Sequence, residues 1–282
     1  MSSRRGSGGA GMDITIRKFD PSKMDDRRVC MIIGKRNTGK SVLTKDIMYF
    51  KRHIPVGVVM SGTEEGNGWY SSWVPDCFIY NEFDREAVEK LIRRQRRLCK
   101  TGNHQKVFLV LDDCMFDKKV MREKCIRQIF MNGRHWGIFL AVTSQYVADA
   151  GPEIRSNCDY VFVLRENIQQ NRERLWRMFF GIFPTLDSFN AALTACTEDY
   201  QCLVLDNTSK SNRIEDCVFW YKAKQRDNFR MGSPLLWHFH SRNYNPEYDA
   251  DDDPRPDPAT RRQRLITIQK LPSRPRKVSR RG

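Results

Sequence analysis

One segment of the sequence carries a complete phosphate-binding loop, the pattern G-x-x-x-x-G-K-[ST]. Its residues are Gly34, Lys35, Arg36, Asn37, Thr38, Gly39, Lys40 and Ser41. In such a loop the glycines let successive backbone N–H groups point at phosphate oxygens, the lysine reaches the β- and γ-phosphates, and the hydroxyl binds Mg²⁺. Lys40 and Ser41 are therefore predicted to hold ATP and its Mg²⁺ ion. The alternative is a glycine turn that binds nothing.

The residues around this loop stand in the order that the motif requires. Val29–Ile33 is a short apolar run typical of a buried strand. After the loop, apolar residues recur at helical spacing, at Val42, Leu43, Ile47 and Phe50. The sequence thus predicts a strand, a loop and a helix, with the positive N-terminal end of the helix directed at the phosphates.

A second apolar run ends in two carboxylates. Val107–Leu111 is typical of a fully buried parallel strand, and Asp112 and Asp113 follow it directly. Chemistry in nucleotide-binding parallel sheets lies at the carboxyl ends of the strands. Asp112 is therefore predicted to hold Mg²⁺ through water, and Asp113 to polarise the attacking water. The alternative is a solvated acidic turn after a strand.

A third apolar run, Gly137–Val142, leads into a polar end that includes Gln145. Gln145 is a candidate sensor that contacts the γ-phosphate or the attacking water; the alternative is an ordinary polar strand end. Phosphoryl transfer also profits from an arginine, often supplied by a neighbouring subunit. Arg134 is the preferred candidate over Arg155, although any one of the 49 Lys and Arg is most simply a solvated surface group.

Taken together, these motifs resemble those of the poxvirus-type genome-packaging ATPase of nucleocytoplasmic large DNA viruses. That family is a branch of the superfamily that includes the bacterial chromosome translocases. The matching segments are Ile33–Ser41, Leu109–Asp113, Asn132–His135, Thr143–Gln145, Phe179–Pro184, Tyr200–Asp206 and Val218–Ala223. The resemblance covers roughly residues 12–240. The first two motifs are shared by many P-loop proteins, and the later ones are more specific.

The resemblance implies an α/β fold, a RecA-like P-loop NTPase core with a mainly parallel sheet flanked by helices. It also implies a homo-oligomeric ring around double-stranded DNA, ATP-driven translocation of a genome into a capsid, and capsid or portal-site proteins as partners. The protein would then act in the host-cell cytoplasm or nucleus at viral assembly sites, or in the virion. Many relatives have Glu as the catalytic base where this chain has Asp113, one methylene shorter.

Charge is concentrated at the ends of the chain. Residues 258–282 contain nine Lys or Arg and no acid, and Arg4 and Arg5 stand alone at the other end. Of the formal net charge of +15, only +4 is left for residues 12–257. The domains expected are a disordered basic N-terminus, 1–11, a P-loop ATPase domain, 12–240, and a disordered Pro/Arg-rich tail, 241–282. Such a tail would bind nucleic acid in a salt-dependent, sequence-independent way, dock on a capsid protein or serve as a nuclear import signal.

Other patterns bear on the class of protein. Nine cysteines without a C-x-x-C pattern suit buried free thiols in a reducing compartment. His238 and His240 are more simply structural than a metal site. No apolar run approaches the roughly 20 residues that span a membrane. Leu203–Asp206 and Val218–Tyr221 predict a C-terminal β-hairpin at one edge of the sheet.

Two surfaces are candidates for gripping DNA. The helix expected over Asp84–Lys100 places five basic residues largely opposite its apolar face, which is also what a solvated helix surface looks like. The loop Ser61–Trp73 is the second candidate. Two rival functions stay open: a P-loop kinase that transfers phosphate to a small-molecule acceptor, and a non-catalytic nucleic-acid-binding protein with a vestigial ATP site.

Overall fold

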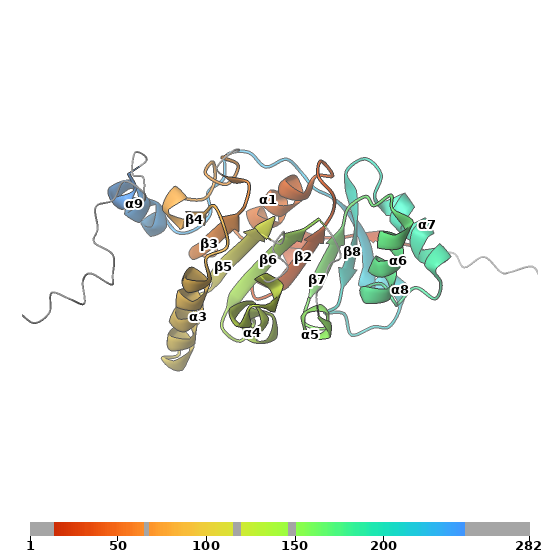
Figure 1. The fold of residues 1–282 in the computed structure, drawn as a ribbon, viewed down its shortest axis with the longest axis horizontal. Helices are drawn as coiled ribbons and strands as arrows, with labels where there is room; N and C mark the ends of the chain where they lie inside the picture. Colours follow the sequence, from red (N-terminus) through yellow and green to blue (C-terminus); the bar gives the residue numbers. More distant parts are fainter. Residues whose placement is uncertain (1–13, 65–67, 115–119, 146–150, 246–282) are drawn as a thin grey trace, which may run out of the picture. The chain divides into compact units, whose positions relative to one another are not determined.

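The computed structural model describes residues 14–64, 68–114, 120–145 and 151–245. The described strands form one nine-stranded sheet in the order β1-β9-β8-β7-β2-β6-β5-β3-β4 (Figure 1). They are β1 Arg17–Lys18, β2 Val29–Ile33, β3 Val56–Ser61, β4 Ile79–Tyr80, β5 Val107–Asp112, β6 Ile138–Ser144, β7 Tyr160–Val163, β8 Gln201–Asp206 and β9 Val218–Lys222. Within this sheet β8 is antiparallel to both neighbours, and the other pairs are parallel. The predicted mainly parallel α/β fold is confirmed.

Helices cover both faces of the sheet. They are α1 Lys40–Phe50, α3 Arg85–Lys100, α4 Lys124–Asn132, α5 Pro152–Arg155, α6 Gln169–Met178, α7 Leu186–Cys196, α8 Ile214–Cys217 and α9 Pro234–Asn243, with short 3-10 helices at Pro21–Lys23, Asp76–Phe78 and Val120–Arg122. Apolar side chains of α3, α4, α5, α6 and α7 pack in one core cluster. Those of α1 and of the segment around Tyr70 and Trp73 pack in the other. Successive residues of a strand point to opposite faces, so β2 sends Met31 into the first core and Ile32 into the second.

Several boundaries differ from the sequence-based expectation. The sequence Cys77–Tyr80 predicts a short strand, but only Ile79–Tyr80 forms one, since Asp76–Phe78 forms a 3-10 turn. The sequence Lys118–Met131 predicts a helix. In the structure this stretch forms the 3-10 turn Val120–Arg122 followed by α4, and residues 115–119 lie outside the described part of the chain. The predicted hairpin is confirmed as β8 and β9, which pair antiparallel, although β1 lies beyond β9 at the edge.

The expected ends of the chain can be followed only in part. The predicted disordered segment 1–11 and nearly all of 241–282 fall outside the described residues. Helix α9 continues through Asn243, three residues past the boundary expected at 240. No helix among the described residues is long and apolar enough to cross a membrane. All nine cysteines are free, and seven of them are buried.

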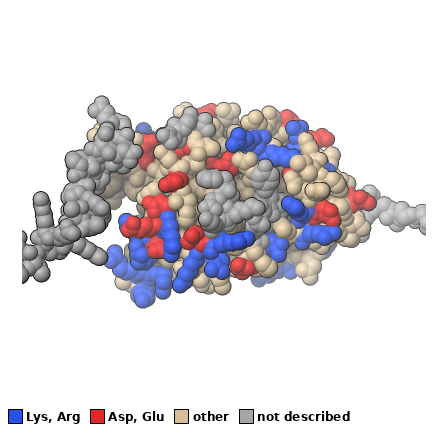
Figure 2. Space-filling model, viewed as in Figure 1, with Lys and Arg blue, Asp and Glu red and all other residues tan. Residues whose placement is uncertain are grey.

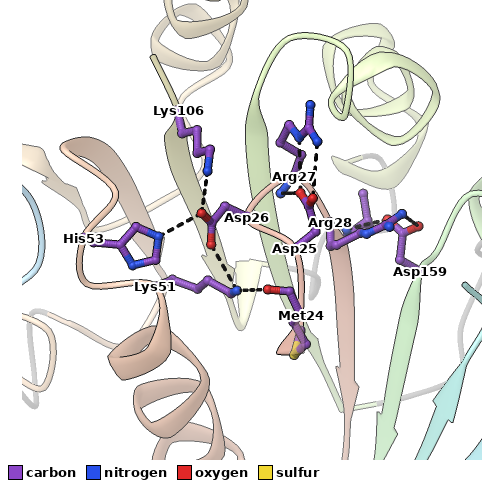
Figure 3. A network of polar contacts seen from close by, with 10 residues as sticks. Met24, Asp25, Asp26, Arg27, Arg28, Lys51, His53, Lys106 and Asp159 are labelled. Atoms are coloured by element: carbon purple, nitrogen blue, oxygen red, sulfur yellow. Dashed lines mark hydrogen bonds and ion pairs between the residues drawn. The ribbon is translucent and has the colours of Figure 1, made fainter. Parts of the chain in front are cut away.

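A partly buried carboxylate ties together the segments that carry the phosphate-binding loop (Figure 3). Asp26, just before β2, accepts hydrogen bonds from Lys51 (3.1 Å) at the end of α1, from His53 (2.8 Å) and from Lys106 (2.6 Å) before β5. Lys51 is only 2% exposed and also donates to the carbonyl of Met24. Burial alone would raise the pKa of Asp26, but the hydrogen bonds from His53, Lys106 and Lys51 outweigh it and lower the pKa well below its usual value.

We expect Asp26→Asn to lower the free energy of unfolding by about 3 kcal/mol at pH 7, because it leaves the buried Lys51 ammonium without a carboxylate. The pKa of Asp26 is lower in the folded state than in the unfolded state. Its stabilising effect is therefore present above the unfolded pKa of about 4 and is lost as the pH falls below it.

Urea unfolding of the variant at pH 7 and at lower pH measures both effects. Asp25→Asn is the matched control, because Asp25 pairs with Arg27 at the surface and should cost less than about 1 kcal/mol. Equal losses in the two variants, or a loss in Asp26→Asn that grows as the pH falls, would contradict this account.

Candidate nucleotide site

The phosphate-binding loop lies between β2 and α1, at the edge of the sheet where the parallel strands end. The N–H of Gly34 donates to the carbonyl of Ser144 (3.0 Å), which joins the start of the loop to the end of β6. Gly39 has φ +98° and Asn37 has φ +60°, so the loop turns through left-handed conformations before α1 begins at Lys40. Glycine adopts such a conformation without steric cost, which explains its place before the helix.

A pocket of about 420 Å³ opens beside this loop. Its walls are Lys35, Asn37, Gly39, Lys40, Ser41, Val42, Thr63, Trp69, Tyr70 and Asp112. The Lys40 ammonium donates to the Lys35 carbonyl (3.2 Å) and is buried within the loop. Burial lowers the pKa of Lys40, while the carboxylates of Asp113 and Asp112 act in the opposite direction. The structure thus brings the predicted residues Lys40, Ser41 and Asp112 around one pocket.

The ends of β5 and β6 form a hydrogen-bonded group. The hydroxyl of Thr143 donates to Oδ1 of Asp112 (2.5 Å) and accepts from the N–H of Asp113 (3.0 Å). The side-chain amide of Gln145 donates to both carboxylate oxygens of Asp113 (3.0 and 2.9 Å). Asp113 has φ +53°, an uncommon conformation for a residue other than glycine. The predicted residues Asp113 and Gln145 therefore meet.

The donor set suits Mg²⁺ rather than a metal held by protein alone. Mg²⁺ in nucleotide sites usually takes one or two protein oxygens and fills its octahedron with phosphate oxygens and water. Ser41 and Asp112 supply such oxygens to one pocket, and the described residues contain no cluster of three or more His, Cys, Asp or Glu that could hold a metal ion. Burial raises the pKa of the Asp112 carboxyl, against the hydrogen bond from Thr143.

Several residues of the site were not predicted from the sequence. Thr143 is one: it lies in the matching segment Thr143–Gln145, but the sequence assigned no role to its hydroxyl. Glu166 is another: it forms an ion pair with Lys35 of the loop (2.6 Å). Burial of Glu166 opposes ionisation, but the hydrogen bond from Lys35 and others lower its pKa. Nothing in the sequence separated this glutamate from surface acids.

The loop Ser61–Trp73, one of the two candidates for gripping DNA, contributes Thr63, Trp69 and Tyr70 to the wall of the pocket. The carboxylate of Glu64 accepts from the N–H groups of Tyr70 and Ser71, at 2.9 Å from Oε1 in each case, and this folds the loop back. The ammonium of Lys45 on α1 lies over the ring of Trp69, 5.0 Å from the ring centre. Tyr70 and Trp73 are buried in the core. Residues 65–67 lie outside the described part.

The two candidate arginines lie away from this pocket. Arg134 is exposed in the turn before β6, and Arg155 ends α5 before β7. Both therefore lie where strands begin, at the opposite end of the sheet from the phosphate-binding loop of the same chain.

His240 forms an ion pair with Asp76 (3.5 Å) and stacks on Tyr244, which agrees with a structural role.

Comparison with known proteins places the chain among viral proteins. No protein-family model matches it. The uncharacterized protein L437 of Acanthamoeba polyphaga mimivirus is 34% identical over 246 residues, which cover 84% of this chain and 86% of L437. The uncharacterized protein 075L of Invertebrate iridescent virus 6 is 36% identical over 253 residues, which cover 85% of this chain and 98% of 075L. The chain belongs to this family of large-DNA-virus proteins.

Solved structures with this fold include the genome-packaging NTPase B204 of Sulfolobus turreted icosahedral virus 2. B204 in complex with sulfate aligns with a TM-score of 0.52 and 16% identity, over 72% of this chain and all of B204. At this identity the likeness concerns the fold, which is that of a P-loop ATPase. The packaging-ATPase superfamily and the poxvirus-type assignment both stay predictions.

The close fit around Gly34 gives a test of the loop's packing. A Cβ at Gly34 would lie 2.8 Å from Cβ of Leu164 and 2.7 Å from the Thr38 hydroxyl, whereas a Cβ at Gly181 would meet nothing within 4 Å. We expect Gly34→Ala to lower the free energy of unfolding by roughly 1–3 kcal/mol through overpacking. Gly181→Ala, the control, should stay within about 0.5 kcal/mol of the natural chain. Urea unfolding measures both, and similar values for the two would disprove the close fit.

Proposed function

We propose that this protein is an Mg²⁺-dependent ATPase motor that moves double-stranded DNA into a viral capsid during virion assembly. The observation that carries the proposal is the group at one edge of the sheet: Lys40 and Asp112 share a pocket, and Asp113 is bonded to Gln145 beside it. The packaging part is supported by the fold shared with B204, which is a genome-packaging NTPase of another virus.

Each residue has a role that its position allows. Backbone N–H groups of residues 34–41 and the Lys40 ammonium would bind the phosphates, and Ser41 and Asp112 would hold the ion. Mg²⁺, when bound, neutralises charge that develops on the phosphate oxygens. Asp113 would orient the attacking water and accept its proton. Because Thr143 holds both aspartates, their spacing is set before substrate arrives.

Gln145 offers a route from hydrolysis to movement. Its amide N–H groups donate to Asp113 in this structure. A contact between Gln145 and the γ-phosphate would draw on the same donors, so the Asp113–Gln145 bonds would change when phosphate leaves. Such a change would act on the end of β6, which Gln145 directly follows. This sensor role is part of the proposal.

A basic surface on α3 is the best-placed candidate for the DNA contact. Towards the start of α3, Arg85, Lys90 and Arg93 form ion pairs with glutamates. Towards its end, exposed Arg96, Arg97 and Lys100 have no carboxylate partner among the described residues. Figure 2 shows basic side chains gathered over α3 and α4. Unpaired cations of this kind suit a polyphosphate backbone.

The basic surface continues into the turn that holds Arg134. Sγ of Cys99 donates to the carbonyl of His135 (3.4 Å), and the Arg96 guanidinium lies 5.8 Å from the ring centre of Trp136. Arg134 and His135 are both exposed. Arg134 would thus act on a nucleotide only when it comes from a neighbouring subunit of a ring, the arrangement that we propose. Capsid or portal partners, and action at viral assembly sites, belong to the same proposal.

The enzymatic part is tested by phosphate release from Mg²⁺-ATP, with and without long duplex DNA. We expect DNA to stimulate release, and Lys40→Ala to abolish it, because the buried ammonium is the group that reaches the phosphates. Lys210→Ala, at an exposed loop position, is the matched control and should keep the activity. Hydrolysis that DNA does not stimulate would favour the kinase alternative. A function on DNA that is retained in Lys40→Ala would favour the non-catalytic nucleic-acid-binding protein.

The DNA contact is tested separately by reversing charge on α3. We expect Arg96→Glu with Arg97→Glu to weaken duplex binding at least tenfold and to reduce the slope of log affinity against log salt by about 2, since about two phosphate contacts are lost. Hydrolysis without DNA should stay unchanged. The control is Arg174→Glu with Arg177→Glu on α6, where both arginines are also exposed. Equal effects of the two double variants would show that only net charge matters.

A further inference from the structure

A second pocket adjoins the phosphate-binding loop on the side of β7 and β8. It has a volume of about 170 Å³ and is lined by Asn37, Thr38, Arg165, Thr197, Asp199, Tyr200 and Gln201. β8 runs opposite to β7, so the start of β8 lies at the same edge as the end of β7. Asn37 lines this pocket and also the phosphate pocket. One ligand could therefore extend from the first pocket into the second across Asn37.

Tyr200 presents an aromatic ring at this place. It is 68% exposed, more than Phe239 and Tyr244, the other exposed aromatic residues in the described part of the chain. A Cβ at Gly39 would lie 3.5 Å from Cδ1 of Tyr200, so the ring lies beside the last glycine of the loop. An exposed ring next to a phosphate site has a flat apolar face available for a ligand.

The backbone holds the ring in an unusual way. Asp199 (φ +50°) and Tyr200 (φ +58°) are consecutive non-glycine residues in the left-handed region. Such conformations persist only where the surroundings impose them, and they concentrate at ligand sites. Here Asp199 forms an ion pair with Lys222 of β9 (2.5 Å), and the N–H of Gln201 donates to the Glu198 carbonyl (2.9 Å). The turn is thus fixed on both sides of the ring.

We propose that Tyr200 is the platform on which the base of the nucleoside triphosphate stacks, and that Arg165 supplies hydrogen-bond donors at the rim of the same pocket. This inference rests on the proposed binding of ATP at the loop. Stacking on an aromatic ring suits a purine, which has a large π-face, and requires no particular hydrogen-bond pattern. The base would lie over the second pocket while Lys40 and the loop hold the phosphates.

The test compares two ligands that differ in the base. Affinities of ATP and of inorganic tripolyphosphate, each with Mg²⁺, are measured by calorimetry on the full chain. Tyr200→Asn removes the ring, and asparagine tolerates the left-handed backbone. Stacking of a base on an aromatic ring is worth about 1–3 kcal/mol, so we expect the affinity for ATP to fall about 5- to 150-fold. The affinity for tripolyphosphate should not change. Tyr200→Phe should bind ATP like the natural chain.

Tyr244→Asn is the matched control, because Tyr244 is an exposed tyrosine at the end of α9. It should leave both affinities unchanged. If Tyr200→Asn weakens both ligands equally, the ring supports the fold or a subunit contact and the inference is wrong. It is also wrong if neither affinity changes, or if the natural chain binds the two ligands equally well. A natural chain that binds neither ligand would overturn the proposed ATP site, and this inference with it.

Discussion

The parallel pairing of β2 with β6, and of β6 with β5, is the constraint on which the site depends. It brings the ends of three strands to one edge, where the chain presents the loop after Ile33, the carboxylates after Leu111 and the amide of Gln145. A shift of one residue in either register would turn every side chain of the shifted strand to the opposite face of the sheet. Because those strands are buried on both faces, such a shift would disrupt the packing of both cores and is strongly disfavoured.

Two carboxylates, one partly buried and one fully buried, hold the elements on either side of the loop. Asp26 ties the start of β2 to the end of α1, at the edge opposite the nucleotide pocket. Asp46, within α1 and fully buried, accepts from the Tyr221 hydroxyl (2.5 Å) and from Nε of Arg226 (2.6 Å). α1 is thereby attached to the far half of the sheet as well. An anion site made of backbone N–H groups needs such support, since its affinity depends on groups that are already in place.

The arrangement suggests how one nucleotide could influence distant parts of the protein. The pocket beside Lys40 touches the loop around Tyr70, which packs on α1, and the pocket beside Tyr200 touches the start of β8. At the end of β6, Gln145 contacts the carboxylate of Asp113. The basic surface of α3, together with Arg134, lies at the other end of the sheet, where the parallel strands begin. Changes at the nucleotide would therefore have to pass through the packed strands to reach a DNA contact there.

Much of the site could be predicted because its signals are local. The loop 34–41, the aspartates after an apolar run, the order strand, loop and helix, and the hairpin of β8 and β9 each follow from neighbouring residues, whose spacing sets backbone geometry and burial. What the sequence could not supply depends on contacts between segments far apart in the chain. Thr143 meets Asp112, Glu166 meets Lys35, and Tyr200 lies beside Gly39 only once the sheet has formed. The tertiary structure likewise decided that the loop with Tyr70 lines the pocket and that Arg134 lies at the opposite edge, because strand order and direction are properties of the whole sheet.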